Sequence, residues 1–138
     1  MRGRFLLGAS LLASAMATVP VHAVEPAATV YSVSIRLHDG DRLVGEPRLK
    51  VHAGATAQVE IRDAEGHGFS VSLVARPGPD ADVSVSSSID ATSITGFRQA
   101  IHPKLIVKPG QEAAIAFGQD TGTQKPFRVD ITVEQAAL

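Results

Sequence analysis

Cysteine and tryptophan are absent from this 138-residue chain, and aromatic residues make up only 4% of it. Without cysteine the protein has no thiol nucleophile, no thiolate zinc site and no disulfide bond. Packing of the core must therefore hold the fold by itself. Aromatic side chains are too few to build an exposed platform on which a sugar could stack. The aromatic residues beyond the N-terminal region are Tyr31, Phe69, Phe97, Phe117 and Phe127, and most of them fall on expected core positions.

A large excess of charge of either sign is also absent. The chain has 13 Lys and Arg against 14 Asp and Glu, and its formal net charge is −1 with the histidines neutral. Binding to nucleic acid requires a basic surface, and so does adhesion to anionic lipid. The composition therefore argues against both of these as partners.

Residues 1–23 have the pattern of a secretory signal peptide. Arg2 and Arg4 form a short positive region, an apolar stretch follows, and Val21-His22-Ala23 places small residues where a signal peptidase reads them. The apolar stretch is short for a membrane span and is interrupted by polar residues. We therefore expect export to the periplasm or secretion, no stable membrane insertion after cleavage, and a single domain over residues 24–138.

Period-two alternation of apolar and polar residues dominates the rest of the chain, and no window shows the 3.6-residue period of a helix. Turns rich in glycine, proline and aspartate separate the alternating segments. This pattern predicts an all-β fold, namely an antiparallel β-sandwich of about seven to eight strands. The strands are expected near residues 29–37, 43–52, 56–62, 68–76, 82–90, 102–108, 112–118 and 126–134.

One sequence pattern occurs twice, as PRLKVHAGATAQVEI at residues 47–61 and PKLIVKPGQEAAIAF at residues 103–117. The matching positions are apolar residues of one face and turn glycines, such as Gly54 and Gly110. We interpret each segment as a β-hairpin, which is followed in both copies by a similar third strand. The sandwich is therefore predicted to contain two similar three-stranded units, at about residues 47–76 and 103–134.

The second copy of this pattern resembles a hairpin of the secretin β-domain, which belongs to outer-membrane channels of type II and type III secretion. A secretin subunit is far longer, with ring domains before this region and a membrane-facing segment after it, so the resemblance does not extend to a pore. It implies an exported β-domain of the bacterial envelope that works by contact with another envelope protein. The matching positions are Pro103, Leu105, Gly110, Gln111, Glu112, Ala113, Ile115 and Gly118.

The outward positions differ between the two copies, and this difference indicates a contact surface. In the first copy these positions are charged or polar, whereas the second copy has apolar residues beside two lysines. An exposed apolar patch is typical of an interaction site. A partner could bind this outer face, or it could add a strand at an unpaired edge of a sheet, although the sequence does not show which strands are edges. The alternative is that another strand, or the segment 94–100, covers the patch. The candidate partner-contact residues are Lys104, Ile106, Lys108, Ala114 and Ala116.

No catalytic, cofactor-binding or metal-binding motif is present in the sequence. The histidines His38, His52, His67 and His102 lack the spacing of a metal-ligand pair, and we expect most of them in solvated turns. No G-x-S-x-G motif occurs. The sequence therefore favours a non-catalytic protein-interaction module without a cofactor. A small-ligand or glycan-binding sandwich and an enzyme of unrecognised type, with His67 or His102 at its centre, remain as alternatives.

Overall fold

The structure, a computed structural model, describes residues 29–136, and the expected signal peptide lies outside the described residues. Ten β-strands and one short 3₁₀ turn, η3, follow one another along this part of the chain. Among these residues no helix is long and apolar enough to cross a membrane. The elements are β1 (Val30–Asp39), β2 (Arg42–Gly45), β3 (Arg48–His52), β4 (Thr56–Arg62), β5 (Gly68–Pro77), η3 (Pro79–Ala81), β6 (Val83–Thr92), β7 (Arg98–Ile101), β8 (Lys104–Val107), β9 (Glu112–Phe117) and β10 (Phe127–Gln135).

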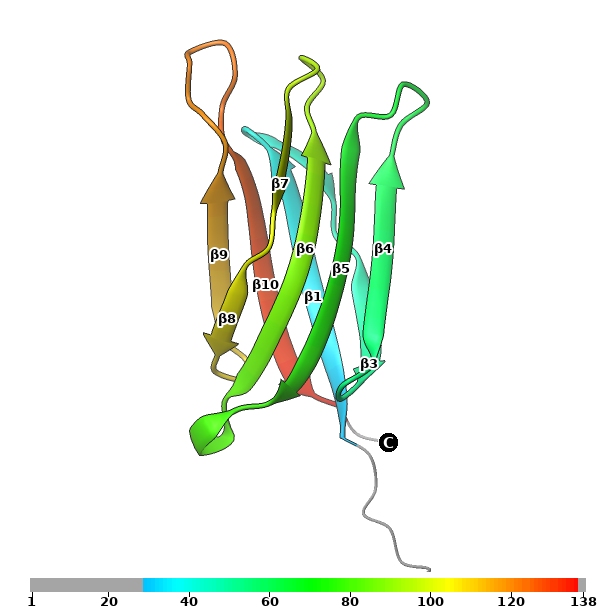
Figure 1. Ribbon diagram of the computed structural model, residues 1–138, viewed down its shortest axis with the longest axis vertical. Coiled ribbons are helices and arrows are strands. Elements are labelled where there is room, and N and C mark those ends of the chain that lie inside the picture. The colour runs from blue at the N-terminus through cyan, green and yellow to red at the C-terminus, as the bar shows by residue number, and fades with distance from the viewer. Residues whose placement is uncertain (1–28, 137–138) are drawn as a thin grey trace, which may run out of the picture.

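The strands form two antiparallel sheets that pack face to face, which confirms the predicted all-β sandwich (Figure 1). The first sheet has the order β2-β1-β10-β9, and β3 also pairs with β1. The second sheet has the order β4-β5-β6-β7, and β8 also pairs with β6. The structure has ten strands rather than seven or eight. Pro47 divides the expected strand 43–52 into β2 and β3, and β7, which Pro103 separates from β8, was not among the expected strands. Proline has no N–H to donate to a ladder.

The two repeated segments are not hairpins, and this corrects the interpretation made from the sequence. β3 pairs with β1 in the first sheet, whereas β4 pairs with β5 in the second sheet. The turn at residues 53–55 therefore carries the chain from one sheet to the other. The turn between β8 and β9 does the same in the opposite direction. Alternation shows which residues face the core, but a crossing between sheets preserves that alternation as well as a hairpin does.

The pairing scheme of β1–β5 is repeated by β6–β10, so each unit contains five strands rather than the predicted three. β1 and β6 are the inner strands that pair with the two interrupted edges, and β5 and β10 pair with β4 and β9. Equivalent backbone bonds close the two crossing turns. The N–H of Gly54 donates to Ala75 O and that of Gly110 to Val133 O, both at 2.9 Å.

The core lies between the sheets and consists of the inward residues of the inner strands. Phe127 is fully buried at its centre and contacts three other phenylalanines. Its ring centroid lies 5.6 Å from that of Phe69, 5.3 Å from that of Phe117 and 5.9 Å from that of Phe97. Aromatic clusters of this kind contribute packing energy beyond the area that they bury. The aromatic side chains are therefore used for the core, as the sequence predicted.

Candidate functional site

The sandwich has four lateral edges, where backbone N–H and C=O groups lack a neighbouring strand. Such edges can pair with another chain, and proteins protect them with charged side chains, prolines or interruptions. The edge formed by β2 and β3 is interrupted at Pro47 and carries Arg48 and Lys50. The edge formed by β7 and β8 is interrupted at Pro103 and carries Lys104. Both of these edges are therefore protected.

The other two edges, β4 and β9, are uninterrupted, and they differ in their side chains. β4 has Gln58, Glu60 and Arg62 on its outer face. β9 has Ala114 and Ala116 at the positions equivalent to Gln58 and Glu60, and both alanines are exposed. Figure 1 shows β9 at the margin of the molecule, with no strand beyond it. β9 is therefore the one edge of the described fold without protection along its length.

Hydrogen bonding in the first sheet determines which backbone groups of β9 are free. At the two ends of the β1–β10 ladder, Gly40 N–H donates to Pro126 O and Ala136 N–H donates to Val30 O. Successive residues of a strand bond to opposite sides, so alternate residues from 126 to 136 bond to β1. The residues between them, Phe127, Val129 and Ile131, bond to β9.

The register of β10 with β9 then identifies the free groups. Phe127, Val129 and Ile131 lie opposite Phe117, Ile115 and Ala113, which therefore bond to β10. The backbone N–H and C=O groups of the alternate residues point away from the sheet. These residues are Glu112, Ala114 and Ala116, and two of them carry the short side chain of alanine.

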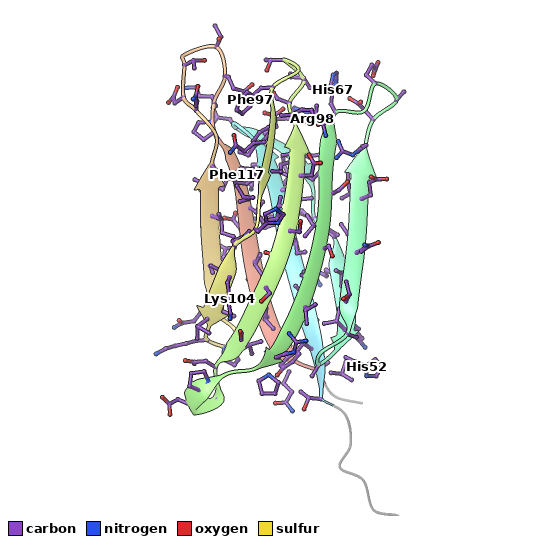
Figure 2. All side chains as sticks on the ribbon, viewed as in Figure 1. His52, His67, Phe97, Arg98, Lys104 and Phe117 are labelled. Carbon is purple, nitrogen blue, oxygen red and sulfur yellow. The ribbon has the colours of Figure 1, made fainter. Side chains whose placement is uncertain are left out.

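The residues predicted as one contact surface lie in two different sheets. Lys104 and Ile106 are on β8, where Ile106 lies opposite Ser84 of β6, and Figure 2 labels Lys104 on that strand. Ala114 and Ala116 are on β9 in the other sheet. Lys108 lies in the turn between the two strands and is exposed.

Neither part of this surface is covered by other elements of the described fold. The side chain of Ile106 is 54% exposed. The segment that was expected as a possible cover, residues 94–100, instead leads into β7, which pairs with β6. The structure therefore leaves the apolar positions of both strands open to solvent, but on the outer faces of two opposite sheets.

An ion pair around a buried carboxylate stabilises the outer face of the first sheet beside β9. Asp130 is only 3% exposed and lies opposite Ala114 of β9. Arg128 Nε donates to Asp130 Oδ1 at 2.8 Å, and His38 Nε2 lies 3.4 Å from Asp130 Oδ2. The bond to Asp130 raises the pKa of the Arg128 guanidinium. His38 is therefore part of β1 and of this polar cluster, not of a solvated turn as expected.

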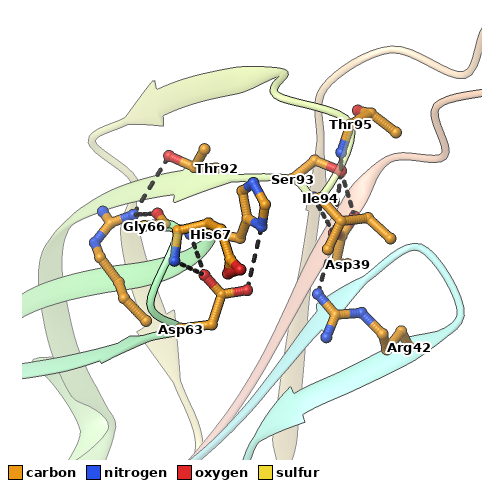
Figure 3. Close-up of polar contacts among 11 residues, drawn as sticks. Asp39, Arg42, Asp63, Gly66, His67, Thr92, Ser93, Ile94 and Thr95 are labelled. Atoms are coloured by element: carbon orange, nitrogen blue, oxygen red, sulfur yellow. Dashed lines mark hydrogen bonds and ion pairs between the residues drawn. The ribbon is translucent and has the colours of Figure 1, made fainter.

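At one end of the sandwich a second polar cluster connects the turn after β1 with the loop after β6 (Figure 3). Asp39 at the end of β1 accepts hydrogen bonds from Ser93 Oγ at 3.0 Å and from the N–H of Ile94 at 3.2 Å. Arg42 lies 3.6 Å from the same carboxylate. Ser93 is almost fully buried, so its hydroxyl needs this partner. These contacts connect the turn between β1 and β2 to the loop between β6 and β7.

The loop between β4 and β5 contains the one group of three potential metal ligands within residues 29–136, namely Asp63, Glu65 and His67. The Asp63 carboxylate is already used by the loop itself. Its Oδ1 accepts the N–H groups of Glu65 and His67 at 3.0 and 2.9 Å, and its Oδ2 lies 3.2 Å from the His67 ring (Figure 3). These bonds explain the shape of the loop without an ion.

Asp63 provides a test of this loop by pH titration. The hydrogen bond from the His67 N–H is the main cause that holds the pKa of Asp63 below its ordinary value. Because the folded pKa is lowered, the stabilising effect is present above the unfolded pKa and is lost as the pH falls through the folded pKa. We expect an NMR titration of Asp63 to give a midpoint below that of a model peptide. The amide signal of His67 should shift with the same midpoint, and a normal midpoint would contradict the hydrogen bonds described.

A depression lies on the outer face of the second sheet. It has a volume of about 520 Å³ and runs over β4, β5 and β6. Its lining is mostly polar, and it includes Glu60, Ser70, Ser72 and Asp90 but no aromatic residue. Shallow polar depressions of this kind differ from the enclosed, largely apolar pockets that bind small ligands.

A scan against protein-family models found no match, and searches of curated proteins and of solved structures found none either. The resemblance to the secretin hairpin therefore stays a prediction.

The interpretation of the site comes instead from a comparison of the two copies within the chain. Sequence reasoning identified the apolar outward positions of the second copy and included strand addition at an unpaired edge, but it could not identify β9 as that edge. The available signal was the stretch EAAIAF, which lacks proline and has a single charge at its start.

Proposed function

We propose that this protein is an exported, non-catalytic domain of the bacterial envelope that binds another protein by strand addition at β9. In this mode an extended chain pairs with the free edge of a sheet, and backbone hydrogen bonds supply much of the affinity. The observation that carries the proposal is the contrast between β4 and β9. They are equivalent strands of one repeated scheme, and only β9 has an unprotected edge.

The first copy serves as an internal control for the requirements of the fold. Gln58 and Glu60 of β4 occupy the places that Ala114 and Ala116 take on β9. A strand in this position therefore tolerates long polar side chains. Since the fold does not require alanine there, the short side chains of β9 are better explained by a partner that must approach its backbone closely.

A glycan-binding function is the second candidate, and the depression on the second sheet is the place where it would act. Gln58, Glu60 and the serines of β5 could donate and accept hydrogen bonds with sugar hydroxyls. No aromatic side chain lines the depression, so stacking cannot contribute. We therefore favour protein binding at β9. A glycan array with binding lost in Glu60→Gln, and unchanged in Ala114→Pro, would reverse this preference.

The proposal is tested with the variant Ala114→Pro, which changes a free-edge position of β9. The introduced proline would lack the N–H that a partner strand needs, while the β9–β10 ladder would keep all its bonds. We expect crosslinking pull-downs from periplasmic extract to capture a defined envelope protein with the wild type and to lose it with Ala114→Pro. Mass spectrometry of the crosslinked peptides should place the contact on residues 112–117.

Gln58→Pro is the matched control, because Gln58 occupies the equivalent position on β4. This variant should capture the same protein as the wild type. Circular dichroism should show the same β-sheet signal for all three proteins. Equal capture by the wild type and Ala114→Pro would contradict strand addition at β9, whatever protein was bound.

A further inference from the structure

We infer that the strand that pairs with β9 is β9 of a second copy of this chain, so that the envelope protein captured at this edge is the protein itself, in a two-fold symmetric dimer. This inference rests on the proposed function, because it names the occupant of the same edge. Two identical edges that meet antiparallel form an isologous interface, the commonest type in homodimers. The first sheets of the two copies would then join into one continuous sheet.

Side-chain direction restricts the register of such a pair. Residues that lie opposite each other must point to the same face of the joined sheet. In addition, the three free-edge residues of β9 must meet free-edge residues of the second copy to form hydrogen bonds. One register pairs all three among themselves: Ala114 lies opposite Ala114, and Glu112 lies opposite Ala116 of the second copy. Shifting the axis to Ile115 would place Glu112 opposite Gly118, which lies beyond the strand and has a φ of 99°.

This register also matches the two strands chemically. No like charges meet, because Glu112 faces alanine rather than a second glutamate. On the inner face, Ala113 lies opposite Ile115 of the second copy. Both residues are only partly buried in the single chain and pack against the margin of the core. Their apposition removes apolar surface from water, and the alanines on the outer face allow close approach.

The ends of the paired strands are electrostatically complementary. The turn before β9 carries Lys108, and the loop after β9 carries Asp120, and both side chains are exposed. An antiparallel pair centred on Ala114 brings the turn of each copy next to the loop of the other. Opposite charges therefore meet at both ends of the interface, which favours the antiparallel over the parallel arrangement.

The remaining edges explain why association would stop at two copies. After β9 is paired, the joined sheet ends on both sides at the edge formed by β2 and β3. That edge is interrupted at Pro47 and carries Arg48 and Lys50, which repel an equivalent edge. Interrupted and like-charged edges resist further strand addition. The arrangement therefore closes as a dimer and does not extend into a fibre.

Sedimentation equilibrium tests the dimer with the purified protein. We expect the wild type and Gln58→Pro to approach twice the chain mass as concentration increases. Ala114→Pro removes the donor on the symmetry axis from both copies, and we expect its dissociation constant to rise at least about tenfold. A wild type that stays monomeric at the highest soluble concentration would overturn the inference. An equal dissociation constant for Ala114→Pro would overturn it as well.

Single cysteines test the register, since the chain has no cysteine of its own. Residues of a hydrogen-bonded antiparallel pair have Cα atoms about 5.5 Å apart, within the range of a disulfide. Mild oxidation should therefore link Ala114→Cys into a dimer, but not Ala116→Cys, whose counterpart is Glu112. Equal linking of both variants would overturn the register. A monomeric wild type that still loses an envelope partner in Ala114→Pro would overturn the dimer and leave the proposed function standing.

Discussion

Replacement of Gly68 by alanine is expected to destabilise the protein by at least about 4 kcal/mol, a large share of the total stability of a domain this size. Gly68 begins β5 and has a φ of 143°, a conformation that is almost restricted to glycine. A Cβ added there would lie 2.0 Å from the carbonyl oxygen of Ile61 and 2.9 Å from Cα of Arg62. Both contacts are with backbone of the adjacent strand, so no side-chain movement can relieve them.

Gly54→Ala is the matched control for this prediction. Gly54 also has a positive φ, of 83°, but an added Cβ would meet no atom within 4 Å. We expect a cost of about 1 kcal/mol, which reflects the backbone conformation alone. Urea unfolding can be followed by the fluorescence of Tyr31, since the chain has one tyrosine and no tryptophan. Similar unfolding midpoints for Gly68→Ala and Gly54→Ala would contradict the described approach of β4 and β5.

Replacement of Phe127 by alanine is expected to cost about 3–5 kcal/mol. The side chain is fully buried and contacts the rings of Phe69, Phe97 and Phe117. Its removal leaves a cavity between the two sheets and takes away three aromatic contacts at once. The surrounding rings come from different parts of the fold, so they cannot close the space without moving the sheets.

Phe97→Ala and Phe127→Leu separate these contributions. Phe97 is only partly buried and lies at the margin of the cluster, so its loss should cost about 1–2 kcal/mol. Phe127→Leu keeps most of the volume and should cost less than Phe127→Ala. Urea unfolding of the three variants shows which substitution lowers the free energy of unfolding most. A larger effect for Phe97→Ala than for Phe127→Ala would place the centre of the core elsewhere.

Much of the fold could be predicted from the sequence, because alternation of side chains directly reports burial in a sheet. The inward residues of β5 and β10, such as Val71 and Val129, were identified from their spacing alone, and they are buried. The pairing of the strands could not be predicted in this way. β3 and β4 lie in different sheets, although their pattern and the turn at Gly54 are those of a hairpin. Which strand a segment pairs with depends on contacts far away in the chain.

At the candidate site, too, some features could be predicted from the sequence and others could not. The outward positions of Ala114 and Ile106 follow from alternation, and both side chains are exposed as expected. Their separation onto two sheets follows from the crossing between β8 and β9, which the sequence does not reveal. The free backbone groups of Ala114 and Ala116 depend on the ladder between β1 and β10, whose partners are distant in the sequence. The edge could therefore be recognised only once the topology was known.

Residue-resolved amide hydrogen exchange tests the central claim, occupation of the β9 edge, most directly. The amides of Ala114 and Ala116 point away from the sheet, as do those of Gln58 and Glu60 on β4. We predict that exchange at Ala114 and Ala116 slows strongly between dilute and concentrated protein, while Gln58 and Glu60 exchange rapidly in both samples. Fast exchange at all four amides, at high concentration and with periplasmic extract present, would contradict strand addition at β9.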